Sequence, residues 1–182
     1  MFTTLTTVSR KQWDARECKP RKKLNHPVKK VIIHKTNSKE CYTNHSCEYL
    51  VRKLQKFHMK KDKKADIKYN FLITVNNNIY EGRGWQYQGE HTEGLDDQSI
   101  GIAFQMRYGD RPPDAEEIQL AKDIILYGIK KGYIDEDFEV IPHNALSDDI
   151  VCPGLVMLEE LINFPKKLKR QKEKEKLREQ SG

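Results

Sequence analysis

The chain has 182 residues and a formal net charge of +6, with 37% hydrophobic and 33% charged residues. This length suits one domain with a hydrophobic core of its own, and no run of 18 apolar residues is present that could form a membrane-spanning helix. Met1 to Val8 are polar and too short to contain the apolar part of a secretory leader. Either a leader has been removed or the protein is not secreted through one.

Most of the positive charge lies at the end of the chain. Residues 166–182 contain eight Lys or Arg and three Glu, which accounts for all but one of the six net charges. Such a tail can bind nucleic acid or anionic lipid. However, Lys and Glu alternate in it, and no aromatic residue follows Phe164 to stack on bases. We therefore expect a solvated extension, helical or disordered, and no nucleic-acid partner.

Apolar runs and alternating patterns predict five strands, at residues 29–34, 69–75, 78–81, 99–106 and 138–141. A helix capped by Asn44 or Ser46 is predicted to end near Met59, with its apolar positions at helical spacing, namely Tyr49, Leu50, Leu54 and Phe57. A second helix begins near Asp114 and stops at Gly132, and a third is opened by Pro153.

Strands that alternate with three main helices indicate a single α/β domain with a mixed central sheet. Residues 1–28 lack periodicity and are predicted to be an irregular segment over the surface, anchored by Trp13. The domain then spans residues 29–165, and the basic tail spans residues 166–182.

Two histidines follow predicted strands and a cysteine lies nearby. His34 ends the apolar run 31–34, and His143 lies nine positions before Cys152. Two imidazoles and a thiolate would leave Zn²⁺ a fourth position for water, the pattern of a catalytic site. The alternative is a pair of polar residues at a sheet edge and a cysteine packed as a small hydrophobe.

Glycines and aromatic rings are interleaved in residues 81–94, which contain four glycines together with Trp85, Tyr87 and His91. Glycine lets the backbone approach a ligand closely, and the rings offer flat surface to it. A plain long loop is the alternative interpretation. Elsewhere, a disulfide between Cys41 and Cys47 would fix the start of the following helix and favour an oxidising compartment, although four cysteines also suit a reduced protein.

With these elements in order, the chain resembles a peptidoglycan recognition protein domain, related to the amidase-type lysozymes of phages, from about Val8 to Phe164. Eight motifs carry the resemblance, and they read SRKQW at 9–13, VIIH at 31–34, the Cys41/Cys47 pair, FHM at 57–59, DIKYNF at 66–71, YEGRGW at 80–85, GIAF at 101–104 and CPG at 152–154.

The resemblance implies a mostly parallel sheet, three helices and a ligand groove on one face. In amidase members the groove holds zinc on positions that match His34, His143 and Cys152, and a tyrosine that supports the zinc-bound water matches Tyr69. The implied reaction is hydrolysis of the amide between N-acetylmuramic acid and L-alanine, in the setting of innate immunity. Zinc would make hydroxide available near neutral pH.

Three departures from the family pattern bear on this activity. Lys35 replaces a second histidine, and Asn144 stands where the family has an arginine. Ile150 replaces a Thr or Lys two positions before the zinc cysteine, and loss of one oxyanion donor typically costs about 10²- to 10³-fold in rate. The alternative to an amidase is therefore a recognition protein that binds peptidoglycan without cleaving it, or cleaves it very slowly.

The expected partner is bacterial peptidoglycan or its muropeptides, with self-association on ligand binding as a further expectation. Arg83 favours the type with meso-diaminopimelic acid, because a guanidinium can bind the extra carboxylate, although Lys63 and Lys64 replace the family's companion pair. The ligand-binding side chains that we predict are Thr36, His58, Lys63, Lys64, Tyr69, Arg83, Trp85 and His91. The cysteine pair and the family favour a secreted or extracellular protein, with a cytoplasmic one as the alternative.

Overall fold

Five strands form one sheet in the order β3-β2-β4-β1-β5 in the computed structural model, which describes residues 4–106, 111–146 and 158–180. The strands are β1 (Val28–Lys35), β2 (Phe71–Thr74), β3 (Asn78–Glu81), β4 (Ser99–Phe104) and β5 (Ile134–Pro142). β2 and β3 are antiparallel, whereas the β2–β4, β4–β1 and β1–β5 pairs are parallel. The expected mixed, mostly parallel sheet of a single α/β domain is confirmed.

The strand predictions fall on the observed strands, and the largest difference is at the edge strand β5. It begins at Ile134 rather than at residue 138, and Ile134 pairs with Val28 before a register shift in the ladder. The polar stretch 135–137 hides this part of the strand from a hydrophobicity pattern. An edge strand tolerates such charges because they discourage pairing with another chain.

The helices are α1 (Asn44–Lys60), α2 (Ala115–Lys130), α3 (Glu159–Ile162) and α4 (Phe164–Gln180). Thr43, one residue before the predicted cap, caps α1 and forms a capping box with Ser46. Asp114 caps α2 as predicted, and Gly132 follows that helix at a φ of +73°, a conformation that favours glycine. The start predicted at Pro153 lies outside the described residues.

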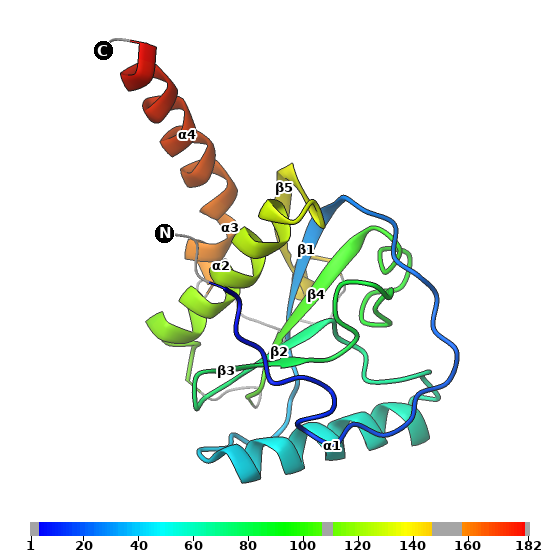
Figure 1. Cartoon of the computed structure of the whole chain (residues 1–182). Helices are drawn as coiled ribbons and strands as arrows, with labels where there is room; N and C mark the ends of the chain where they lie inside the picture. Colours follow the sequence, from blue (N-terminus) through cyan, green and yellow to red (C-terminus); the bar gives the residue numbers. More distant parts are fainter. Residues whose placement is uncertain (1–3, 107–110, 147–157, 181–182) are drawn as a thin grey trace.

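Two hydrophobic cores lie on opposite faces of the sheet because side chains alternate along each strand. Val31 and Ile33 belong to the larger core, which α2 and α3 cover, whereas Leu72 and Ala103 belong to the smaller core, which α1 and Trp13 cover. Figure 1 shows α1 below the sheet and α2 with α3 to its left. Counted along β1, His34 alternates with Val31 and Ile33, so it points to the same face of the sheet as Ile32 and away from the larger core.

The orientation of α1 corrects one of our expectations. Tyr49 and Phe57 were predicted to be part of its apolar stripe, but 54% and 52% of their surfaces are exposed. The buried stripe consists of Cys47, Val51, Leu54, Gln55 and His58. Cys47 is bonded to Cys41, and both are buried in the smaller core. The disulfide thus fixes which face of α1 contacts the sheet.

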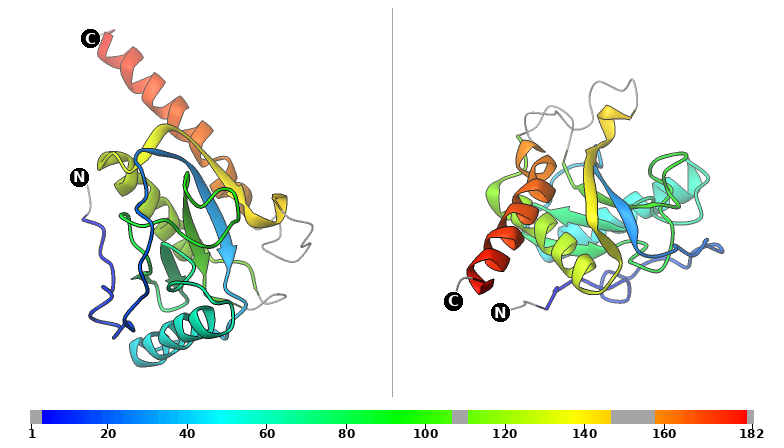
Figure 2. Two further views of the ribbon diagram at one scale, coloured as in Figure 1. Left: turned by 90° about the vertical axis from the view of Figure 1, so that its right-hand side faces the viewer. Right: turned by 90° about the horizontal axis from the view of Figure 1, so that it is seen from above.

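The two ends of the chain differ in how they contact the domain. Residues 4–27 contain no helix or extended strand, and Trp13 is fully buried there, donating its indole N–H to the carbonyl oxygen of Glu81 at 2.9 Å. This confirms the predicted anchor. Residues 166–180 of the basic tail are helical, as part of α4, and this helix projects away from the body of the molecule (Figures 1 and 2). In the described part of the chain, no helix is long and apolar enough to cross a bilayer.

Candidate functional site

His34 and His143 lie next to each other because of the register of two parallel strands. β1 pairs with β5, with Ile33 opposite Pro142, and a histidine follows each of these two residues in the sequence. His143 begins the short 3-10 helix η1 (His143–Ala145). The two imidazole centroids are 4.6 Å apart with an interplanar angle of 34°. Residues 109 positions apart in the sequence thus meet at the carboxyl edge of the sheet, where open α/β sheets bind ligands.

Two further predicted side chains surround this pair. The Tyr69 ring, just before β2, lies 5.2 Å from the His34 ring and 5.6 Å from the His58 ring. His58 comes from the inner face of α1, and its Nδ1 accepts a hydrogen bond from the backbone N–H of Lys68 at 3.1 Å. This bond requires an unprotonated Nδ1, so His58 is a neutral imidazole in this arrangement.

His91 contacts His34 directly. Its Nδ1 lies 3.0 Å from His34 Nε2, with one of the two nitrogens as donor, and 2.9 Å from Thr92 Oγ1. A Cβ atom added to Gly89 or Gly101 would lie 2.2 or 2.3 Å from His91 Cδ2. The imidazole of His91 therefore fits only because both neighbouring positions lack a side chain.

Burial favours the neutral form of His34, His58 and His91. It is the main cause that lowers the pKa of His34 well below 6.5, and the nearby His91 and His143 lower it further. The pKa of His91 falls to about 3, first through burial and then through His143 and Arg83. The pKa of His58 also falls to about 3, chiefly through burial and then through Lys68. Neutral imidazole is the form that binds metal ions.

The predicted zinc site can be compared with these residues. Imidazoles at adjacent strand ends suit Zn²⁺, and the buried Nε2 of His91 makes no hydrogen bond among the described residues, with Asp96 Oδ1 3.6 Å from it. Within residues 4–106, 111–146 and 158–180, no three His, Cys, Asp or Glu side chains converge on one metal position. Cys152, the predicted third ligand, lies outside the described residues, as does Ile150.

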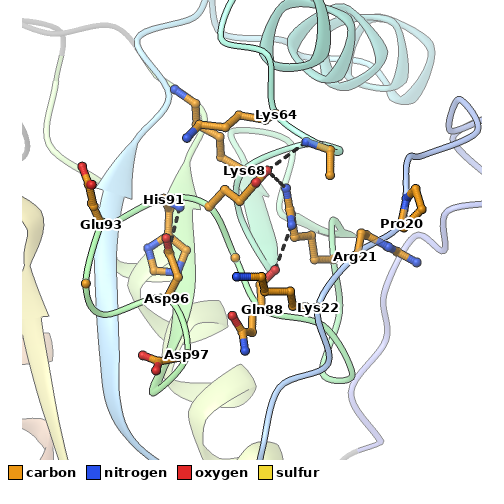
Figure 3. A pocket seen from close by; sticks show the side chains of 15 residues that line it. Pro20, Arg21, Lys22, Lys64, Lys68, Gln88, His91, Glu93, Asp96 and Asp97 are labelled. Carbon is orange, nitrogen blue, oxygen red and sulfur yellow. Dashed lines mark hydrogen bonds and ion pairs between the residues drawn. The ribbon is translucent and has the colours of Figure 1, made fainter.

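A charged pocket of about 800 Å³ lies beside the imidazole cluster, and His91 is part of its wall (Figure 3). Its cationic side chains are Arg21, Lys22, Lys64, Lys68 and Arg83, and its carboxylates are Glu90, Glu93, Asp96 and Asp97. In Figure 3 Lys64 and Lys68 lie on one side of His91, and Asp96 and Asp97 lie on the other. The pocket thus presents both signs of charge.

The guanidinium of Arg83 is held within the protein. It is buried, and it donates to the carbonyl oxygens of Ile67 at 2.6 Å and Gln88 at 2.9 Å. A third bond goes to the carboxylate of Glu90. A ligand carboxylate would therefore meet Arg83 at a position that Glu90 now occupies, so the two residues act together in this wall of the pocket.

Three of the predicted ligand-binding residues, besides His58 and Tyr69, do not line the charged pocket. Trp85 packs on the larger core, stacked on Tyr133 at 4.9 Å with an interplanar angle of 14°. Lys63 is exposed and does not line the pocket. Thr36 hydrogen-bonds Ser38 through its hydroxyl group, at 2.7 Å. Aromatic residues in a glycine-rich segment were therefore a mixed signal, since His91 reaches the site and Trp85 stabilises the core.

Strand alternation separates Lys35 from His34. Side chains of consecutive strand residues point to opposite faces, so Lys35 follows the parity of Val31 and Ile33, which lie in the larger core. Lys35 is itself buried. The substitution at this position therefore puts a cation behind the sheet rather than beside the imidazole of His34.

Sequence reasoning missed the contribution of the N-terminal segment to the pocket. Arg21 forms an ion pair with the buried Asp66 at 3.1 Å, and its guanidinium lies over the Tyr87 ring at 3.9 Å. Asp66 also pairs with Arg10 at 3.0 Å. The basic run at residues 19–23 was the available signal, because a carboxylate that folding buries needs cationic partners.

The Cys41–Cys47 disulfide is present, which confirms that prediction, and Cys18 is a free cysteine. The bond lies on the side of α1 that faces the smaller core and contributes no atom to the pocket. Its role at the site is indirect, because it holds the helix that carries His58.

The sequence matches the family described as N-acetylmuramoyl-L-alanine amidase over residues 24–155. Among curated proteins, "Peptidoglycan recognition protein 3" from Homo sapiens is 34% identical over 160 residues, which are 87% of this chain and 46% of that protein. The chain thus spans less than half the length of that relative.

Two solved structures are also similar. The Drosophila peptidoglycan recognition protein SA has a TM-score of 0.83 at 30% identity, with 89% of this chain and 93% of that chain covered. Peptidoglycan recognition protein LE, solved in complex with tracheal cytotoxin, a monomeric diaminopimelic acid-type peptidoglycan, has a TM-score of 0.80 at 31% identity. That match covers 85% of this chain and 91% of the other.

Proposed function

The chain belongs to the N-acetylmuramoyl-L-alanine amidase family and, within it, to the peptidoglycan recognition proteins, and from this membership we propose that it binds peptidoglycan fragments. The observation that carries the proposal is the charged pocket beside the paired imidazoles of His34 and His143. A concave site with a few convergent polar groups is where a small ligand binds.

The pocket suits a peptide stem with charges of both signs. Lys64 and Lys68 can bind carboxylates, and Asp96 and Asp97 can bind an ammonium group. A diaminopimelic acid residue carries both groups at its free end, and a solved relative is named as a complex with such a ligand. We therefore propose this type of peptidoglycan as the preferred ligand, with Arg83 and Glu90 as the residues that respond to the extra carboxylate.

The finer proposal is amide hydrolysis between N-acetylmuramic acid and L-alanine. His34, His143 and Cys152 would hold Zn²⁺, which when bound polarises the amide carbonyl and lowers the pKa of its water to about 7. Burial supports this assignment because it keeps His34 in the neutral, metal-binding form. Tyr69 would donate its hydroxyl proton in a hydrogen bond to the carbonyl oxygen as that oxygen becomes negative.

A specific sequence feature favours recognition without hydrolysis as the second candidate function. Ile150 brings an apolar side chain to a position where catalytic relatives have Thr or Lys. Replacement of that polar group lowers transition-state stabilisation without lowering ligand affinity. Both candidate functions use the same pocket, so they differ in turnover and not in the ligand.

The location and assembly of the protein follow from the same proposal. A disulfide and a bacterial cell-wall ligand favour an extracellular protein. Self-association on ligand binding stays a prediction, to be measured by analytical ultracentrifugation with and without muropeptide.

The test uses two muropeptides, one with a diaminopimelic acid stem and one with a lysine stem. Calorimetry measures the affinity for each, and chromatography with mass spectrometry measures the release of free stem peptide. We expect tighter binding of the diaminopimelic acid form, and release that depends on zinc and is suppressed by chelator, by Cys152→Ser and by Tyr69→Phe. Elemental analysis should give close to one zinc per chain, and none in Cys152→Ser.

Each result decides between the candidates. Binding without release over hours would support the recognition function, and Ile150→Thr should then raise the rate by up to about a hundredfold at unchanged affinity. Absence of binding to both muropeptides would contradict the proposed function altogether. Protein prepared without chelator that contains no zinc would contradict the metal site and leave ligand recognition standing.

A further inference from the structure

The outward face of α1 carries large exposed side chains. Tyr49, Lys53, Lys56 and Lys60 recur at a spacing of four, three and four residues, which places them on one face of the helix. Tyr49 and Phe57 are more than half exposed. Apart from Tyr42, which immediately precedes the helix, they are the exposed large aromatic residues of the described chain. We call this surface, with Arg16 and Arg52 beside it, the outer face of α1.

These side chains line a groove of about 430 Å³. Two of the lining residues are the aromatic Tyr49 and Phe57, and the other six are cationic, namely Arg16, Arg52, Lys53, Lys56, Lys60 and Lys61. No carboxylate lines the groove. Like charges concentrated in this way make this face strongly positive.

The outer face is separate from the peptidoglycan site. The opposite side of the same helix carries Cys47, Val51 and Leu54 into the smaller core and presents His58 to Tyr69. None of the residues of the outer-face groove lines the charged pocket. A ligand of the outer face would therefore leave the pocket open.

The chemistry of this surface matches that of an anionic bilayer. Lysine stems can lie along apolar surface while the ammonium groups reach phosphate, and tyrosine and phenylalanine rings insert at the level of the headgroups. Tyr49 and Phe57 are eight residues apart, about 12 Å along a helix. This separation is too long for stacking on neighbouring bases, and it disfavours single-stranded nucleic acid as the ligand.

We propose that the outer face of α1 is a peripheral binding surface for membranes rich in anionic phospholipid. The six cations attract the surface electrostatically, and the two exposed rings add contact with the interface. This binding is reversible, since neither a spanning helix nor a lipid anchor is needed for it. It goes beyond the proposed recognition of peptidoglycan and depends on different residues.

The basic helix α4 provides the matched control. It carries eight cationic residues in residues 166–182, but three glutamates alternate with them and no aromatic residue follows Phe164. It also lies at the other end of the molecule from α1, as the views of Figures 1 and 2 agree. The two helices can therefore be changed independently.

The experiment is vesicle flotation of the whole protein with phosphatidylcholine vesicles, with and without 25% phosphatidylglycerol, at low and high salt. We expect partition into the anionic vesicles alone, and at least a tenfold loss of binding for Lys53→Glu combined with Lys56→Glu. The same charge change in α4, Lys174→Glu with Lys176→Glu, should leave binding within about threefold. Tyr49→Ser with Phe57→Ser should lower binding severalfold at both salt concentrations, because ring insertion is not screened.

Each alternative outcome overturns the proposal. If the α4 variant loses as much vesicle binding as the α1 variant, the interaction depends on the overall charge of the protein and not on the outer face of α1. If the protein binds neutral vesicles as well as anionic ones, electrostatic attraction does not drive the binding. Binding to heparin or oligonucleotide without binding to anionic vesicles would identify a polyanion site instead. All substituted positions are exposed, and thermal unfolding of each variant verifies that the fold is kept.

Discussion

The imidazole cluster and the outer face of α1 use similar residue types in opposite ways. In the cluster, His34, His91 and His58 are buried, and burial lowers their pKa values so that they remain neutral. On the outer face, lysines and aromatic rings are exposed to water. Buried histidines are thus neutral and suited to direct contact with a ligand, whereas exposed lysines and arginines are suited to the long-range attraction of negative charge.

The Cys41–Cys47 disulfide holds both regions in place, because it fixes which side of α1 faces the core. Replacement of both cysteines by serine should lower the free energy of unfolding by about 2–3 kcal/mol, as expected for a short closed loop. Chemical denaturation measures this loss. Cys18→Ser is the matched control, since Cys18 is free and only partly buried, and an equal loss there would contradict the role of the disulfide.

A substitution at Gly101 tests the packing of the imidazole cluster separately from the disulfide. In Gly101→Ala the new methyl group would lie 2.3 Å from His91 Cδ2, and overpacking of this kind typically costs about 1–3 kcal/mol. The variant should also bind muropeptide more weakly, since His91 lines the pocket. In a protein that already carries His91→Ala, Gly101→Ala should lower the free energy of unfolding much less. Equal costs in both backgrounds, measured as a double-mutant cycle, would mean that the ring is not the obstacle.

The neutral state of His58 predicts how stability depends on pH. The folded protein has a pKa of about 3 at this residue, whereas the unfolded chain has about 6.5. Below pH 6.5 the unfolded state therefore binds the proton first, and stability falls as the pH drops towards 3, by up to about 1.4 kcal/mol per pH unit. His58→Gln should reduce this slope, and Met59→Gln should not. A slope that is unchanged in His58→Gln would show that the other histidines account for it.

Substitutions of the exposed charged residues of α4 should have the smallest effect on stability and on ligand binding. Lys169 pairs with Asp137 and Lys172 pairs with Glu136, and all four side chains are largely exposed. Such pairs contribute about 0–1 kcal/mol, so Lys169→Ala should change the midpoint of thermal unfolding only slightly. Deletion of residues 173–182 should leave muropeptide affinity within about twofold. Loss of binding on this deletion would show that the tail is part of the recognition surface.

Local sequence patterns determined much of the architecture. Apolar runs of period 2 and 3.6 placed β1, β2, β4, α1 and α2, because these periods depend on a few neighbouring residues. They missed the first half of β5, whose charged residues are tolerated only because the strand lies at the sheet edge. The family resemblance and strand-end positions also brought His34 and His143 into one proposed site.

Only the tertiary structure decided which of the candidate residues meet. The parallel register of β1 and β5 brings His34 beside His143. The pairing of β1 with β4 places Gly101, against which the His91 ring packs, next to the same strand. Trp85 turned to the opposite core, Arg83 bonded to Glu90, and α1 left Tyr49 exposed. These outcomes depend on packing between segments far apart in the chain. No local pattern encodes them, because the contacts of each side chain depend on which strands and helices lie next to it in the folded protein.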